Sequence, residues 1–198
     1  MRMIWVMALL AACDGGKDTE PTDDTDTTDT TDTTDTTDTT DTTDDTDDTP
    51  DPIVPTDEER AALLWTALDG FETWPQQAPW VGVQQQADGS PHGPYVQVWV
   101  NNIANEAYAD VASDVSDFPP GSVLVKRLYD DAAGATVKPE IFAMWKVEGF
   151  DAANGDWFWA KFDEAGNAEP YGAVGMCSGC HSSGKDFSRI ATDVPGEM

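Results

Sequence analysis

The sequence predicts an α+β domain built on an antiparallel β-sheet, with helices at both ends of the folded region. Three observations support this fold class. A segment with helical spacing of apolar residues opens the region, period-two segments typical of strands follow it, and turn sequences separate those segments at hairpin distances. Strands that follow one another through short turns favour antiparallel pairing, with helices set apart from the sheet.

The first helix is expected to begin after Thr56. The sequence Thr56-Asp57-Glu58-Glu59 places a glutamate three residues after a threonine, which is the pattern of a capping box. Apolar residues then recur at helical spacing and a glycine ends the segment. These residues are Ala61, Leu64, Trp65, Leu68 and Gly70.

Four later segments are typical of strands, because the pattern turns to period two at the first of them and turn sequences precede the others. The Asn154-Gly155 pair directly before the last of these segments is typical of a tight hairpin turn. A short helix is expected between the first two. The strands are expected at residues 95–100, 122–129, 141–147 and 157–162, and the helix at 102–110.

Lys126 occupies an unusual position in the second predicted strand. It shares a face with Leu124 and Leu128, because side chains two residues apart lie on the same side of a strand. Lysine is rarely buried, so the pattern alone favours a solvated sheet edge. The alternative is an apolar pocket, where the pKa of the amine would fall and the amine could become a nucleophile or a ligand.

The sequence Cys177-Ser178-Gly179-Cys180-His181 matches the attachment motif of a c-type haem. Two thiols one helical turn apart can add to two vinyl groups of the same porphyrin, and His181 can then bind the iron as the proximal ligand. A redox dithiol and half of a zinc site are the alternatives. The other histidine and cysteine of the chain, His92 and Cys13, would have to complete a zinc site. The motif therefore favours one covalent haem c per chain.

The N-terminus is typical of a bacterial lipoprotein. Residues 1–12 read as a signal peptide, with an apolar segment too short to span a bilayer, and Leu10-Ala11-Ala12-Cys13 matches a lipobox. A plain secretory peptide is the alternative. The lipobox predicts lipid attachment at Cys13, so the protein would be exported and held to a membrane at the periplasmic or outer-surface side. Export agrees with the haem motif, since haem c is attached outside the cytoplasm.

Residues 13–55 are expected to form a disordered acidic stalk between the lipid and a folded domain at 56–198. Asp and Thr dominate this segment, and Asp14–Glu59 hold 19 of the 38 acidic residues with a single base. Such a segment cannot bury enough apolar surface to fold. Calcium binding is a weaker interpretation, because glycine turns with fixed ligand spacing are missing. No basic cluster is present, which argues against a nucleic acid partner.

Several segments occur in an order that resembles the cytochrome P460 family, a group of periplasmic c-type cytochromes built on an antiparallel sheet. The resemblance covers roughly residues 57–190. The segments are His92–Val96 leading into Trp99–Asn101, Phe118–Ser122 leading into Val125-Lys126, Gly155–Ala160, and the haem motif.

The resemblance implies that Lys126 forms a covalent bond to a haem meso carbon. It also implies that the haem is five-coordinate and oxidises hydroxylamine, with electrons passing to a soluble redox partner. The enzymes of the family use a distal carboxylate, which aligns loosely with Glu140. A sister group, cytochrome c′-beta, lacks the cross-link and binds nitric oxide. Relatives also suggest a homodimer.

Other roles in the pocket remain open in the sequence. His92 and Glu140 are the candidate bases for deprotonating hydroxylamine, although His92 could equally be a loop histidine bonded to backbone. Tyr95 is expected to line the pocket. A third possible function, electron transfer, would need His92 or Met144 as a sixth iron ligand.

Overall fold

The helix predicted after Thr56 is present as α1, Asp57–Ala67, in the computed structural model, which describes residues 54–87 and 89–195. Both hydrogen bonds of the capping box form. The Glu59 N–H donates to Thr56 Oγ1 at 3.2 Å, and the Thr56 N–H donates to Glu59 Oε2 at 2.8 Å. Two backbone donors at the start of the helix are thereby satisfied.

The leader, the lipid attachment at Cys13 and the acidic stalk up to residue 53 lie outside the described residues and stay predictions. Among the described residues, no helix is both long enough and apolar enough to cross a membrane.

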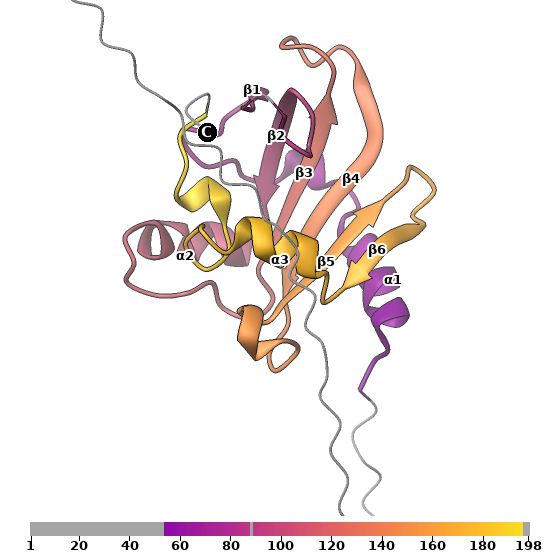
Figure 1. The fold of residues 1–198 in the computed structure, drawn as a ribbon, viewed down its shortest axis with the longest axis vertical. Helices are drawn as coiled ribbons and strands as arrows, with labels where there is room; N and C mark the ends of the chain where they lie inside the picture. The colour runs from indigo at the N-terminus through magenta and orange to yellow at the C-terminus, as the bar shows by residue number, and fades with distance from the viewer. Residues whose placement is uncertain (1–53, 88, 196–198) are drawn as a thin grey trace, which may run out of the picture. The chain divides into compact units, whose positions relative to one another are not determined.

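The predicted α+β class is confirmed by a six-stranded antiparallel sheet in which every strand pairs with its neighbours in the chain (Figure 1). The strands are β1 Gln84–Gln85, β2 Tyr95–Val100, β3 Val123–Tyr129, β4 Val137–Lys146, β5 Trp157–Phe162 and β6 Ala168–Gly172. The other helices are α2 Asn102–Ala112 and α3 Gly175–His181, with short 3₁₀ turns at Phe71–Thr73, Ala152–Asn154 and Arg189–Ala191.

The two edge strands, β1 and β6, escaped prediction from the sequence. β1 consists of two glutamines and has no apolar residue to alternate with. β6 contains Pro170 and ends at Gly172, residues that argue against a strand unless it lies at an edge. β4 also begins four residues earlier than predicted, in the exposed and polar stretch Val137–Glu140. Strands at a sheet edge, and exposed parts of a strand, are held mainly by backbone hydrogen bonds. The pattern of their side chains therefore gives little indication that a strand is present.

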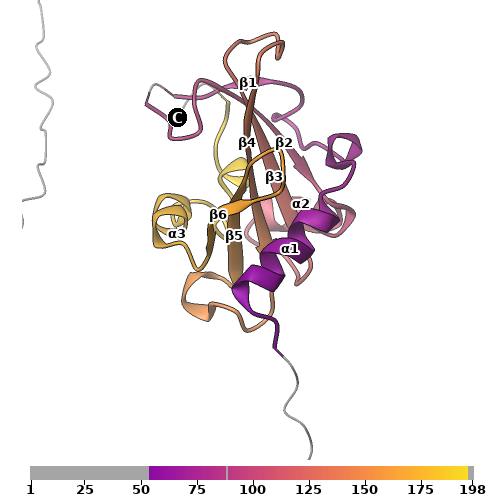
Figure 2. The same ribbon diagram turned by 90° about the vertical axis from the view of Figure 1, so that its right-hand side faces the viewer.

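The sheet separates two apolar cores, because alternate side chains of each central strand point to opposite faces. On one face α1 packs through Leu64 and neighbouring apolar residues against Val125 and Phe158. On the other face α2 and the C-terminal segment pack against Leu124 and Met144. Figure 2 shows α1 and α3 on opposite sides of the sheet. The haem motif therefore lies on the face that α1 does not cover.

Two adjacent leucines of α1 test this packing. We expect Leu64→Ala to lower the free energy of unfolding by about 2–5 kcal/mol, because it leaves a cavity in the core. Leu63→Ala is the matched control, and its effect should stay within about 0.5 kcal/mol, as for other exposed side chains. Leu64 is 1% exposed and Leu63 is 54% exposed. Urea unfolding of the two variants measures the difference, and equal effects would contradict the assigned helix face.

Candidate haem site

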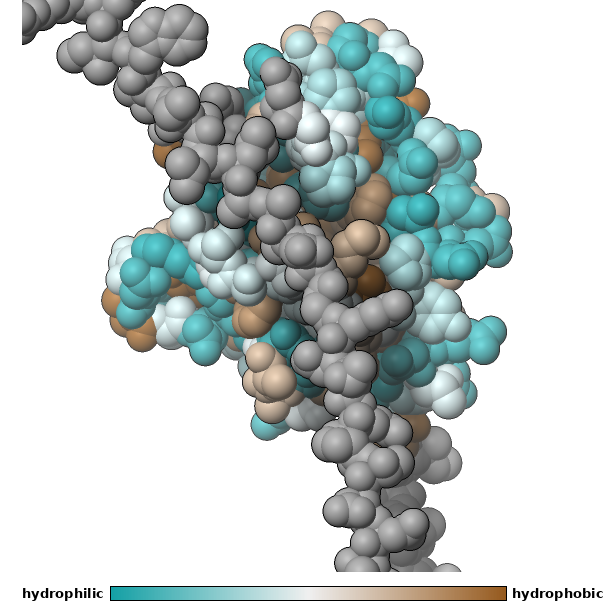
Figure 3. Space-filling view, viewed as in Figure 1, coloured by the Kyte–Doolittle hydropathy of each residue, from teal (hydrophilic) through white to brown (hydrophobic). Residues whose placement is uncertain are grey.

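The haem motif faces a cavity of about 360 Å³ between α3 and the central strands. This volume is in the range of small-molecule and cofactor sites. Figure 3 views the molecule from the side of α3, where hydrophobic residues show near the middle and hydrophilic residues cover most of the right-hand rim. The lining comes from the sheet (Val98, Leu124, Val125, Lys126, Phe142, Ala143, Met144, Trp159, Ala160, Lys161, Pro170), from α3 (Met176, Cys177, Cys180, His181), from the loop before β2 (Pro91, His92) and from the segment after α3 (Ser188, Arg189, Ile190).

The helix α3 presents all three functional groups of the motif to this cavity. Cys177 and Cys180 are one helical turn apart, so both thiols lie on one side of the helix. Cys177 is half-buried, Cys180 is exposed, and both thiols are free. His181 is the last residue of the helix, and its ring lies 4.8 Å from the Trp159 ring between centroids. The sequence motif is therefore folded with its thiols and its imidazole at one cavity.

The orientation of the His181 ring is set by a backbone carbonyl. The Nδ1 atom of His181 lies 2.9 Å from the carbonyl oxygen of Phe187. A hydrogen bond there places the proton on Nδ1 and leaves Nε2 with a free lone pair, the arrangement typical of histidines that bind metals. Burial, with smaller contributions from the charges of Lys126 and Arg189, lowers the pKa of His181 to about 4, and the hydrogen bond to the Phe187 carbonyl partly opposes this shift. His181 is thus a neutral donor at physiological pH.

The Phe187 carbonyl is held in place by a buried ion pair one residue earlier. Lys146, the last residue of β4, donates to both carboxylate oxygens of Asp186 at 2.6 and 2.9 Å, and the two side chains are 9% and 3% exposed. The Phe118 N–H donates to the same carboxylate at 2.8 Å, and Trp157 Nε1 donates to the Asp186 carbonyl at 2.8 Å. Three elements thus fix the turn that orients His181.

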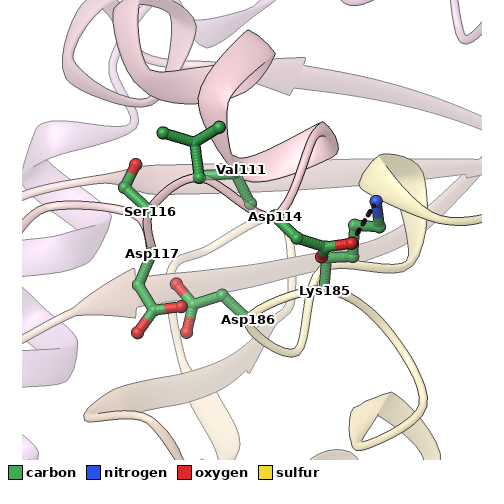
Figure 4. Close-up of a pocket in the computed structure, with 7 residues that line it drawn as sticks. Val111, Asp114, Ser116, Asp117, Lys185 and Asp186 are labelled. Atoms are coloured by element: carbon green, nitrogen blue, oxygen red, sulfur yellow. Dashed lines mark ion pairs between the residues drawn. The ribbon is translucent and has the colours of Figure 1, made fainter.

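Asp186 and Phe187 both adopt positive φ angles, 44° and 60°, in this turn. Such angles are costly for side chains with a Cβ, so the surrounding contacts must hold them. Figure 4 shows the solvent side of the turn, where the Asp117 carboxylate lies beside that of Asp186 and Lys185 turns away to Asp114. Burial raises the pKa of Asp186, the hydrogen bonds from Lys146 and Phe118 oppose the rise, and Asp117 adds to it.

Lys126 reaches the same cavity from the centre of the sheet. It pairs with Val98 of β2 on one side and with Phe142 of β4 on the other, so the interpretation as a sheet-edge residue is wrong. Burial, together with the positive charge of Arg189, lowers the pKa of its amine to about 8, and the charge of Asp193 partly opposes this shift. A larger share of the amine is therefore uncharged and nucleophilic near neutral pH than for an exposed lysine.

Sequence reasoning missed a second lysine at the cavity. Lys161 of β5 lies across from Phe142, which in turn lies across from Lys126, so the three side chains form one row on the same face. Lys161 lines the cavity as Lys126 does. The alternation of Trp157, Trp159 and Lys161 along β5 was the signal that could have identified it.

His92 lies in the loop before β2 and lines the cavity with His181. Its ring packs edge-on against Phe142, with 4.8 Å between centroids. Burial lowers the pKa of His92 to about 2, and the charges of Lys126 and His181 contribute. Its Nδ1 atom is buried without a hydrogen-bond partner among the described residues, so this nitrogen is not bonded to backbone.

Two other predicted site residues are not part of the cavity lining. Tyr95 shares a strand face with Trp99, which belongs to the core under α1, on the opposite side of the sheet. Glu140 lies in the half-exposed first part of β4, two residues before Phe142 along the strand. Met144, the alternative iron ligand, does line the cavity and is 6% exposed.

These residues fit a haem. The cavity is mainly apolar, its two thiols and the His181 imidazole have the order and spacing of a haem attachment site, and His181 keeps one nitrogen free. Polar atoms of three lining residues, His92 Nδ1, Trp159 Nε1 and Ser188 Oγ, are buried without a partner among the described residues. Buried polar groups are normally satisfied, so these atoms indicate a site built for a bound group.

We expect Asp186→Asn to lower the free energy of unfolding by about 3 kcal/mol, since Lys146 would keep a buried charge without a counter-ion. Asparagine tolerates the left-handed backbone and preserves the side-chain shape, so the loss reports on the charge. Asp130→Ala removes an exposed ion pair with Lys138 and is the control, with an expected cost below about 1 kcal/mol. Urea unfolding measures both, and similar losses would contradict the anchoring role of the buried pair.

Comparison with known proteins agrees with this site. The family model described as Cytochrome P460 matches residues 69–191, which is more than half of the chain. The matched residues include the six strands, α3 and the cavity they enclose. No curated protein sequence matches the chain. The chain therefore belongs to the cytochrome P460 family and is a haem protein.

Proposed function

We propose that this protein is an exported, lipid-anchored c-type cytochrome that oxidises hydroxylamine, with Lys126 bonded covalently to the haem. One observation carries the proposal: the Lys126 amine, the thiols of Cys177 and Cys180 and the His181 imidazole all line one apolar cavity. The lowered pKa of Lys126 supports a role as a nucleophile. The predicted signal peptide and the lipobox that ends at Cys13 support export and lipid anchoring.

Covalent attachment would use the two thiols of α3. Each S–H adds across one vinyl C=C of the porphyrin, so that a C–S and a C–H bond form and no electrons are lost. His181 would bind the iron through Nε2, because Nδ1 is engaged by Phe187. The bond from Lys126 replaces one amine N–H and one meso C–H by a C–N bond. It releases two protons and two electrons, so it requires a two-electron oxidant such as a peroxide.

The haem would supply the redox centre at which hydroxylamine is bound and oxidised. Two hydroxylamine molecules yield one nitrous oxide and one water, with four protons and four electrons released. Of the two candidate bases, His92 lines the cavity and Glu140 lies outside the lining, so position favours His92. The lowered pKa of His92, about 2, makes its imidazole a weak base in this environment. The electrons would pass to a one-electron acceptor protein. With a net charge of −28, the chain favours a cationic partner.

Replacing both thiols tests covalent attachment. The test is made in Lys126→Met, which removes the proposed lysine bond as a second covalent link. Produced with a c-type haem maturation system, Lys126→Met should keep haem-dependent peroxidase staining of the denatured chain on a gel. In Lys126→Met/Cys177→Ser/Cys180→Ser the haem should become extractable with acidic organic solvent and the stain should be lost. A Lys126→Met chain that releases its haem on denaturation would contradict the assignment as a c-type cytochrome.

The second cavity lysine provides a matched control for the cross-link. We expect Lys126→Met to convert a broad, red-shifted ferrous Soret band into a conventional c-type spectrum, with loss of hydroxylamine oxidation by an added one-electron dye. Lys161→Met should keep the modified spectrum, because we assign the bond to Lys126. Intact mass should also change, since the linked chain is lighter by two hydrogens. A conventional spectrum in the wild type would refute the cross-link and leave nitric oxide binding or electron transfer.

A further inference from the structure

Two histidines from distant parts of the chain lie across from each other at the cavity. The ring centroids of His92 and His181 are 6.2 Å apart, and the ring planes are nearly perpendicular at 89°. His181 comes from α3 and His92 from the loop before β2, so no local sequence pattern brings them together. Their approach is a property of the fold.

The separation of the two rings matches the space that one metal ion needs between two imidazoles. A bond from a histidine nitrogen to a metal is about 2 Å long, and two such bonds plus the distances from the nitrogens to the ring centres add up to about 6 Å. A gap this narrow would hold a flat macrocycle between the two imidazoles, with an edge of each imidazole facing the flat side of the macrocycle. It leaves little room for an additional small ligand while both imidazoles keep these positions.

Both rings have a nitrogen available for such a bond. His181 uses Nδ1 for the Phe187 carbonyl, which leaves Nε2. His92 has a buried Nδ1 without a hydrogen-bond partner in the described part of the chain. A buried polar atom left unsatisfied is destabilising, so an additional partner is expected for the His92 ring. A metal bond to this imidazole would supply it.

His92 is also held in this position by its surroundings. Its ring packs edge-on against Phe142, a residue of the rigid central strand β4. Its loop turns back on itself through the Gly93 N–H, which donates to the Ser90 carbonyl at 3.0 Å, and through the His92 N–H, which donates to Ser90 Oγ at 3.3 Å. Gly93 has a φ of +78°, which glycine adopts at little cost. The imidazole thus points at the cavity without haem binding having to place it there.

We propose that His92 is the second axial ligand of the haem iron in the resting protein, on the side opposite His181. A small ligand must then displace His92 before it can bind. This displacement step rests on the proposed hydroxylamine oxidation, whereas the ligation itself does not. Once displaced, the same imidazole remains beside the open position, where it can hydrogen-bond to the bound ligand.

Spin state tests the ligation directly. In the ferric full-length holoprotein, two imidazole ligands should give a low-spin electron paramagnetic resonance signal at neutral pH, and near-infrared magnetic circular dichroism should show the charge-transfer band of bis-imidazole ligation. His92→Ala should be high-spin, and added imidazole should restore the low-spin signal by filling the space. Met144→Leu is the control, since Met144 lines the cavity and its thioether can bind iron, and it should stay low-spin.

Three results would overturn the ligation: a high-spin wild type, a low-spin signal that persists in His92→Ala without imidazole, or a switch to high-spin in Met144→Leu alone. The dichroism of the wild type answers the question even if His92→Ala fails to fold, because it identifies the ligand pair without any substitution.

Ligand-binding kinetics separate this proposal from the proposed function. With His92 bound, the rate of cyanide binding to the ferric wild type should level off at high cyanide, limited by dissociation of His92, and should rise linearly in His92→Ala. A linear rise in both would contradict displacement. A His92-dependent low-spin signal without hydroxylamine oxidation would refute the proposed function while the ligation stands, and it would identify an electron-transfer cytochrome.

Discussion

The buried ion pair between Lys146 and Asp186 is the interaction on which the site depends. It joins the end of β4 to the turn after α3 and is nearly closed to solvent. Together with the hydrogen bonds from Phe118 and Trp157 to Asp186, it supplies the contacts that offset the backbone cost of the left-handed residues Asp186 and Phe187. The Phe187 carbonyl is what orients His181. Through one carboxylate, a rigid strand therefore determines which nitrogen of the proximal histidine faces the cavity.

The two faces of the sheet have different roles. One face is closed by α1 and carries only packing, with Phe158 and Phe162 completely buried. The other face carries the cavity, and half of its lining residues stand on the central strands β2 to β5, which are paired on both sides. Side chains on such strands have little freedom to move, which is what precise placement of reactive groups requires. The loop residue His92 gains comparable support from Phe142.

Three nitrogen bases share this apolar cavity. Lys126, His92 and His181 each have a pKa lowered mainly by burial, and Lys126 contributes to the lowering at both histidines. Proximity of several bases with few counter-charges favours the uncharged forms, whose lone pairs can bind metals or act as nucleophiles. The same arrangement is unfavourable for a cationic ligand. The electrostatics of the cavity thus agree with a haem site and with a reactive lysine.

The sequence by itself determined the elements whose signals are local. The capping box at Thr56, the alternation in β2, β3 and β5, and the order of thiols and imidazole in α3 all depend on neighbours within a few residues. Edge strands β1 and β6 were missed, because backbone pairing with little burial leaves no side-chain pattern.

Only the tertiary structure decided the environment of Lys126, Tyr95 and His92. The alternation of side chains along a strand places Lys126 on the same face as Leu124 and Leu128. It does not show whether that face lies at a solvated sheet edge or lines a cavity. Pairing on both sides and the covering segment after α3 decided for the cavity. Tyr95 and His92 are three residues apart in sequence, yet they serve opposite faces of the sheet. The physical reason is that a side chain's surroundings come from segments far away in the chain, whose approach depends on packing rather than on local propensity.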